Sequence, residues 1–168
     1  MIFFKIKSNN ILSIIQTFYK RLPKFHDGRI DYSNSDIAPV IIVFVRYKHK
    51  ILLLKRSDKV RAYKNKWNSV AGYLDELKPI DEKVLEELHE ELNINKNSIS
   101  SMKIGKFYKF TDKKIKKTWI VNPVMVELKD KPKITLNWEH TEFLWIYPSK
   151  IKNYNIVPKV DKSLKIVI

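Results

Sequence analysis

The sequence predicts a single α/β domain. Two apolar runs surround a turn at Lys48 and His49 and are typical of central strands: Val40 to Val45, which is β-branched and aromatic, and Lys50 to Arg56. Residues 80–94 repeat apolar side chains at helical spacing, which predicts an amphipathic helix. More strands are predicted at residues 103–111, 117–128 and 143–147. The 168 residues suffice for one domain with a buried core.

The predicted helix at residues 80–94 is the most informative segment. Taking 100° of rotation per residue, four aliphatic residues form one stripe that faces a core: Val84, Leu85, Leu88 and Leu92. Glu87, Glu90 and Glu91 are spaced i, i+3 and i+4, so their carboxylates converge beside that stripe. Such like-charge pairs cost roughly 0.2 to 0.5 kcal/mol each unless a cation lies among them. Carboxylate oxygens suit Mg²⁺ or Mn²⁺.

The stretch from Gly72 to Ile94 resembles the Nudix box, which reads Gly, five residues, Glu, seven residues, Arg-Glu-aliphatic-any-Glu-Glu-any-Gly-aliphatic. The matching positions are Gly72, Glu87, Leu88, Glu90, Glu91 and Ile94. Three positions depart: Lys78 replaces the first Glu, Glu86 replaces the Arg, and Asn93 replaces the second Gly. Asn93 is the mildest change, because Asn often adopts the left-handed conformation that ends a helix.

Glu86 is the most consequential departure. In the Nudix family the Arg pairs with and orients a metal-binding Glu, so an acid at this position removes a cation beside Glu87. A basic residue distant in sequence could restore the balance, in which case the chain is a working enzyme. Otherwise the site is catalytically silent. The simpler interpretation of the whole segment is a solvated acidic helix, but agreement at several fixed offsets favours the box.

The resemblance implies a Nudix-type α/β/α sandwich with a mixed sheet, preceded by an amphipathic extension at residues 1–25 and spanning residues 26–168. It implies Mg²⁺-dependent hydrolysis of a diphosphate linkage in a nucleoside diphosphate derivative, with metal held by Glu87, Glu90 and Glu91. Gly72 would be the structural glycine of the box. The alternative is a catalytically silent Nudix-fold module that binds nucleotide or RNA.

Two other regions supply candidate site residues. Arg56 ends a predicted strand and, by resemblance, contacts substrate phosphate, for which its planar fork is suited; a surface Arg is an equally simple interpretation. By the same resemblance, Trp138 is a candidate for substrate binding, and Glu139 and Glu142 are candidates for general base or base recognition. His140 is expected to be structural, as lone loop histidines usually are.

Composition limits the remaining possibilities. The chain has no Cys, which excludes disulfides and thiolate chemistry, and its net charge is +15. Residues 80–94 hold six acids and one lysine, a charge of −5, so the other residues sum to +20. A basic surround favours an anionic substrate and makes RNA a possible partner. The basic charge is equally consistent with a genome whose composition favours lysine.

The first 24 residues predict an amphipathic helix that ends at Pro23. Polar residues interrupt its apolar run, and no apolar stretch approaches the roughly 20 residues that cross a bilayer. We therefore expect a cytoplasmic protein without stable membrane insertion. The helix is expected to pack on its own domain or on a second subunit, which would make a homodimer. Peripheral membrane binding is the third interpretation of the function.

Overall fold

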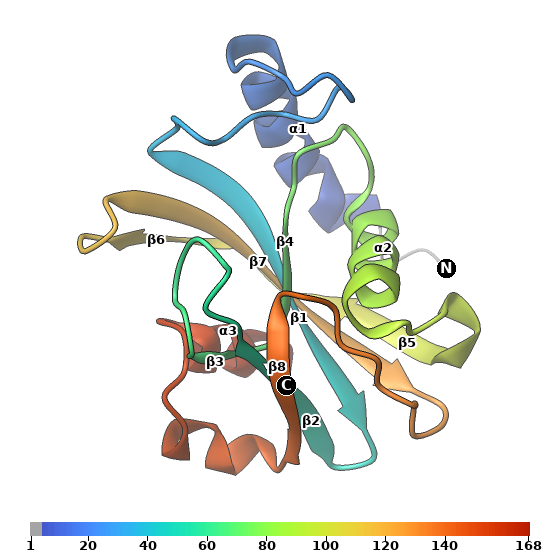
Figure 1. Ribbon diagram of the computed structural model, residues 1–168. Helices are drawn as coiled ribbons and strands as arrows, with labels where there is room; N and C mark the ends of the chain where they lie inside the picture. Colours follow the sequence, from blue (N-terminus) through green and yellow to red (C-terminus); the bar gives the residue numbers. More distant parts are fainter. Residues whose placement is uncertain (1–4) are drawn as a thin grey trace.

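The computed structural model describes residues 5–168 and places helices on both faces of a mixed eight-stranded sheet (Figure 1). The strands are β1 (Ile37–Tyr47), β2 (Lys50–Arg56), β3 (Trp67–Asn68), β4 (Val70–Tyr73), β5 (Ile99–Ile104), β6 (Tyr108–Asp112), β7 (Lys117–Leu128) and β8 (His140–Ile146). The helices are α1 (Lys5–Arg21), α2 (Ile80–Leu92) and α3 (Val160–Val167), with 3-10 turns η1 (Lys96–Ser98) and η2 (Pro148–Asn153). The predicted sandwich with a mixed sheet is confirmed.

Strand β1 is the centre of the sheet. It pairs in parallel with β7 from Ile37 to Arg46, and antiparallel with β4 and, at the hairpin end, with β2. Its side chains alternate between the two faces, as the pleat of a strand requires. Val43 and Val45 belong to the core on one face, and Phe44 belongs to the core on the other. The prediction of a strand buried on both faces is confirmed.

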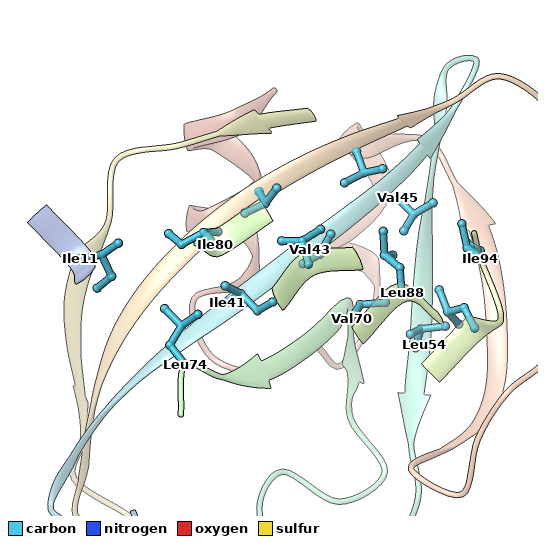
Figure 2. Packing of buried hydrophobic residues seen from close by; sticks show 14 of the residues in the cluster. Ile11, Ile41, Val43, Val45, Leu54, Val70, Leu74, Ile80, Leu88 and Ile94 are labelled. Carbon is cyan, nitrogen blue, oxygen red and sulfur yellow. The ribbon is translucent and has the colours of Figure 1, made fainter. Parts of the chain in front are cut away.

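Different helices cover the two faces. Ile80, Val84 and Leu88 of α2 pack with Ile41, Val43 and Val45 of β1, as Figure 2 shows for most of these residues. On the opposite face, α3 contributes three buried residues to the second core: Val160, Leu164 and Val167. Packing of α2 on the first core places the acidic face of that helix beside β4.

Helix α1 packs on the same face as α2. Ile11 and Ile15 are fully buried in that core (Figure 2 includes Ile11). The expected packing of this helix on its own domain is therefore observed, while the boundary between residues 25 and 26 stays a prediction. Within residues 5–168, every helix falls short of the length and apolar character needed to cross a membrane.

Two parts of the sheet differ from the sequence prediction. The strand predicted at residues 103–111 is two strands, β5 and β6, which pair with different halves of β7. They separate at Gly105, where an added Cβ would lie 2.7 Å from Ile166 of α3, so the chain passes too close to that helix for a side chain. The short strands β3 and β4, in the segment before α2, were not predicted.

Candidate active site

Helix α2 is oriented by its apolar stripe. Val84, Leu88 and Leu92 are fully buried, and this places Glu87 and Glu91 at the edge of the core, with 8% and 1% of their surfaces exposed. Glu90 is exposed. The helix ends at Asn93, which has φ 57° and ψ 34°, so the predicted left-handed conformation is confirmed. Glu87, Glu90 and Glu91 form what we call the acidic ridge of α2. As their spacing predicted, they lie together, and the ridge combines two buried carboxylates with one at the surface.

Gly72 on β4 makes room for one of these carboxylates. A Cβ at this position would lie 2.1 Å from Oε1 of Glu87, far inside contact distance. The backbone of Gly72 does not have positive φ. The glycine is therefore required for close approach of strand and helix rather than for an unusual backbone conformation.

A cavity of about 620 Å³ opens beside the acidic ridge. One wall comes from α2 and includes Glu87 and Glu90. The other walls combine arginines with aromatic side chains: Arg29, Arg56, Arg61, Tyr63, Tyr73, Phe110, Trp119 and Trp138. A cavity with acid on one side, and cations and rings on the other, fits a ligand that joins a metal, phosphates and an aromatic group.

The aromatic wall is held by hydrogen bonds. Nε1 of Trp119 donates to the hydroxyl of Tyr63 at 3.1 Å, and that hydroxyl donates to Oδ2 of Asp112 at 3.0 Å. Tyr73 packs against Trp119 with ring centroids 6.0 Å apart. Burial raises the pKa of Tyr63 to about 12, so its hydroxyl keeps its proton at neutral pH. Tyr63, Trp119 and Tyr73 therefore support one another along this wall.

Burial disfavours the ionised form of the two buried carboxyl groups, Glu87 and Glu91. Burial raises the pKa of Glu91 well above its usual value, and Glu87 and Glu139 add repulsion. Burial likewise raises the pKa of Glu87, against the attraction of Lys83. Oε1 of Glu91 accepts a long hydrogen bond from the backbone N–H of Ala71 at 3.3 Å, while its Oε2 has no hydrogen-bond partner. A cation at this ridge would relieve both costs.

His140 lies beside that unpaired oxygen. Its Nδ1 lies 3.6 Å from Oε2 of Glu91, and 6% of the residue is exposed. Burial, reinforced by Arg56, lowers the pKa of His140 to about 4. The imidazole is therefore neutral at pH 7, and the contact with Glu91 is not an ion pair. The expected hydrogen bond of a structural histidine is also missing among the described residues.

The donor chemistry of the ridge fits a hard divalent cation. All of its candidate ligands are carboxylate oxygens, and one of them is buried without a partner. Within residues 5–168, however, no group of three acidic or imidazole side chains is already arranged as a metal site. Glu87, Glu90 and Glu91 are thus grouped on one ridge rather than closed around a point.

The other candidates fall into two groups. Arg56, Trp138 and Glu139 line the cavity, and Trp138 is 61% exposed. Nε of Arg56 donates to the carbonyl of Ala62 at 3.0 Å, which holds the guanidinium beside the site. Glu142 lies outside the cavity and pairs with Nζ of Lys55 at 2.6 Å, so its predicted place in the site is not supported by its position. Glu139 lies in the turn before β8, whereas Glu142 lies within that strand.

Sequence reasoning missed two lysines of the site. Nζ of Lys83 lies 3.0 Å from Oε1 of Glu87, with 8% of its side chain exposed. Nζ of Lys78 lies 2.6 Å from Oε1 of Glu86. The first pair is spaced i, i+4, the spacing that brings opposite charges together on a helix, so the sequence did contain its signal. The contact of Lys78 with Glu86 depends on how the loop before α2 folds, so no local sequence pattern predicts it.

Comparison with known proteins agrees with this geometry. The profile of the NUDIX domain matches residues 36–165, most of the chain. The chain belongs to the NUDIX domain family. The predicted Nudix membership is confirmed, and with it, at the level of the family, the prediction of a Nudix-type pyrophosphohydrolase. No curated protein matches the chain.

Solved Nudix structures share the fold. A MutT protein from Methanosarcina mazei Go1 is 21% identical, with a TM-score of 0.64 over 79% of this chain and 93% of the other. An Ap4A hydrolase from C. elegans is 18% identical, with a TM-score of 0.61 over 76% and 93%. The NUDIX domain of Shewanella oneidensis NrtR, solved with ADP ribose, is 11% identical, with a TM-score of 0.64 over 76% and 84%. At these identities the likeness is one of fold.

Proposed function

We propose that this Nudix domain hydrolyses a diphosphate linkage in a nucleoside diphosphate derivative, with Mg²⁺ or Mn²⁺ held by Glu87, Glu90 and Glu91. The observation that carries the proposal is the pairing of two walls in one cavity. Glu87 and Glu90 line one side, while arginines and rings line the rest. A cation held at the acidic wall would bind phosphates, and the aromatic wall would pack against a nucleobase.

The residues of the cavity have distinct tasks in this proposal. Bound metal would polarise the phosphate oxygens and lower the pKa of the attacking water. Arg56 faces the cavity and offers its guanidinium to phosphate charge. Glu139 accepts the proton of the water, because it lines the same cavity and burial raises its pKa toward the range useful for a base. Trp138, largely exposed at the rim, offers a face to the base.

Two of the solved relatives support the substrate class. One is named as an Ap4A hydrolase and another was solved with ADP ribose. Both compounds join nucleoside units or sugars through phosphates, which is the class that the cavity suits. Screening should therefore cover nucleoside diphosphate sugars, dinucleoside polyphosphates, nucleoside triphosphates and capped RNA, with and without Mg²⁺. Hydrolysis of no compound in millimolar Mg²⁺ or Mn²⁺ would contradict the proposal.

A second candidate is a silent module that binds nucleotide or RNA. It is favoured by Glu86 in place of the box arginine, and by the finding that no three ligands are preassembled among residues 5–168. Calorimetry separates the two candidates. An enzyme binds Mg²⁺ in the absence of nucleotide, and the variant with Glu90→Gln and Glu91→Gln does not. A silent module binds nucleotide equally with and without Mg²⁺.

A further inference from the structure

We propose that Lys78, Lys83 and Glu86 form a charge network that positions the carboxylate of Glu87, and that Lys78 and Glu86 act in it as a pair with exchanged charges. The Nudix box has an acid at position 78 and a base at position 86. This chain has the reverse, and the two side chains touch. The metal role of Glu87 rests on the proposed function, whereas the network itself does not.

The contact between the two departures explains why they occur together. Nζ of Lys78 lies 2.6 Å from Oε1 of Glu86 and 2.7 Å from Oε2 of Glu76, with 19% of the lysine side chain exposed. Returning only position 78 to Glu would place three acids together. Returning only position 86 to Arg would place it beside Lys78 and Lys83. Each departure is compatible with the fold because of the other.

Lys83 supplies the cation that reaches Glu87. Its Nζ lies 3.0 Å from Oε1 of Glu87, 3.5 Å from Oδ1 of Asp75 and 4.0 Å from Oε2 of Glu86. Glu87 is thus confined between this ammonium and the backbone of Gly72.

Lys78 and Lys83 pair with different glutamates. Glu86 is close enough to Lys83 to compete with Glu87 for it, but Lys78 holds Glu86 at the shorter distance. Lys83 therefore remains available to Glu87. Without Lys78, Glu86 would attract Lys83 away from Glu87 and would itself repel Glu87. Lys83, Glu86 and Glu87 are close enough for this because they lie within about one turn of α2. Lys78 is in this sense a positioning residue that acts through two others.

A double-mutant cycle tests the exchanged pair. The variants are Lys78→Glu, Glu86→Arg and both together, compared by melting temperature and by Mg²⁺-dependent kcat and KM. Each single change should lower the melting temperature and lower kcat about tenfold, and the double variant should return to within about twofold of the parent. Losses that simply add in the double variant would overturn the pairing.

The pair Arg46 and Glu127 is a matched control, because it is also a close, partly exposed ion pair but neither residue lines the cavity. Exchanging these two charges should change kcat in neither the single nor the double variants. If this control moved kcat as much as the cycle at positions 78 and 86, general surface charge would explain the effect. The positioning role would then be rejected.

Lys83 is tested by Mg²⁺ calorimetry, which needs no turnover. Lys83→Met should weaken Mg²⁺ binding about tenfold, because Glu87 loses the ion pair that orients its carboxylate, while Lys83→Arg should retain that pair and the binding. Stronger binding in Lys83→Met would show a competing cation and overturn the proposal. If the parent binds Mg²⁺ but hydrolyses no substrate, the proposed function fails while the network still stands or falls on calorimetry and melting.

Discussion

The acidic face of α2 divides into two halves, Glu86 with Glu87 and Glu90 with Glu91, which have different electrostatic settings. In the first half, Glu86 and Glu87 each pair with a lysine at 3.0 Å or less. In the second half, Glu91 is more deeply buried than either, and the imidazole beside it is neutral at pH 7. The difference teaches that lysines pair with one half, whereas an added cation is what we propose for the other.

The largest effect should come from the half without lysines. Glu90→Gln or Glu91→Gln should lower Mg²⁺-dependent turnover at least about a hundredfold, because a bound metal contributes several kcal/mol of charge stabilisation. Initial rates at saturating Mg²⁺ measure this loss, and circular dichroism checks that the fold persists. Turnover equal to the parent in both variants would place the metal elsewhere.

Gly72→Ala should perturb the half that already has its cation. The new Cβ would occupy the place of Oε1 of Glu87, so the carboxylate must leave Lys83. We expect turnover to fall about tenfold and the free energy of unfolding to fall by about 1 to 3 kcal/mol.

Gly105→Ala is the control for Gly72→Ala, since its Cβ would crowd Ile166 far from the ridge. It should cost similar stability, measured by denaturant unfolding, with unchanged turnover. If both glycine variants lose turnover in proportion to stability, the close approach at Gly72 has no special part in the site.

The pH dependence of stability should differ between Glu91→Gln and the parent in metal-free buffer. Burial raises the pKa of Glu91 above 4.5, so the folded state holds its proton more tightly and loses stability as pH rises from 4.5 through the folded pKa. The opposite trend comes from His140, whose lowered pKa removes stability as pH falls from 6.5 towards 4. Because the variant keeps His140, their difference isolates Glu91.

We therefore expect Glu91→Gln without metal to gain stability relative to the parent as pH rises from 5 to 8. Melting temperatures at pH 5, 6, 7 and 8 in EDTA measure the trend, and saturating Mg²⁺ should reverse it by stabilising the parent alone. A parent that stays more stable than the variant at pH 8 in EDTA would show that Glu91 is already neutralised.

The smallest effect should come from Glu142→Gln, which removes an exposed ion pair with Lys55. Exposed pairs contribute about 0.2 to 1 kcal/mol, so stability should fall by no more than this and turnover should stay within about twofold. Steady-state kinetics on the best substrate of the screen is the measurement. Loss of turnover comparable to Glu139→Gln would return Glu142 to the site.

Local sequence signals predicted the elements that have strong periodicity or long runs. Strand β2 begins and ends where expected, at Lys50 and Arg56, and Asn93 ends α2 in the predicted conformation. Strands β3 and β4, of two and four residues, are too short for a repeating pattern. Their place depends on pairing with β2 and β1, which is tertiary information.

The site was predictable to the extent that it lies on one helix. Glu87, Glu90 and Glu91 follow from spacing, whereas the contact of Glu86 with Lys78 depends on how the preceding loop folds back. The hydrogen-bonded aromatic wall joins Tyr63 to residues about 50 positions later in the chain, beyond any local pattern. The place of Glu142 stays a prediction, and sequence alone did not indicate that this residue would pair with Lys55 outside the cavity.

The parallel pairing of β1 with β7 has a consequence for synthesis of the chain. Arg46 is paired with Glu127, 81 residues later, so one edge of the central strand has no partner until β7 has been made. At typical elongation rates of 5–20 residues per second this takes roughly 4 to 16 s. During that interval the apolar run from Val40 to Val45 offers an open edge to other chains, and a chaperone that shields it should raise the yield of folded protein.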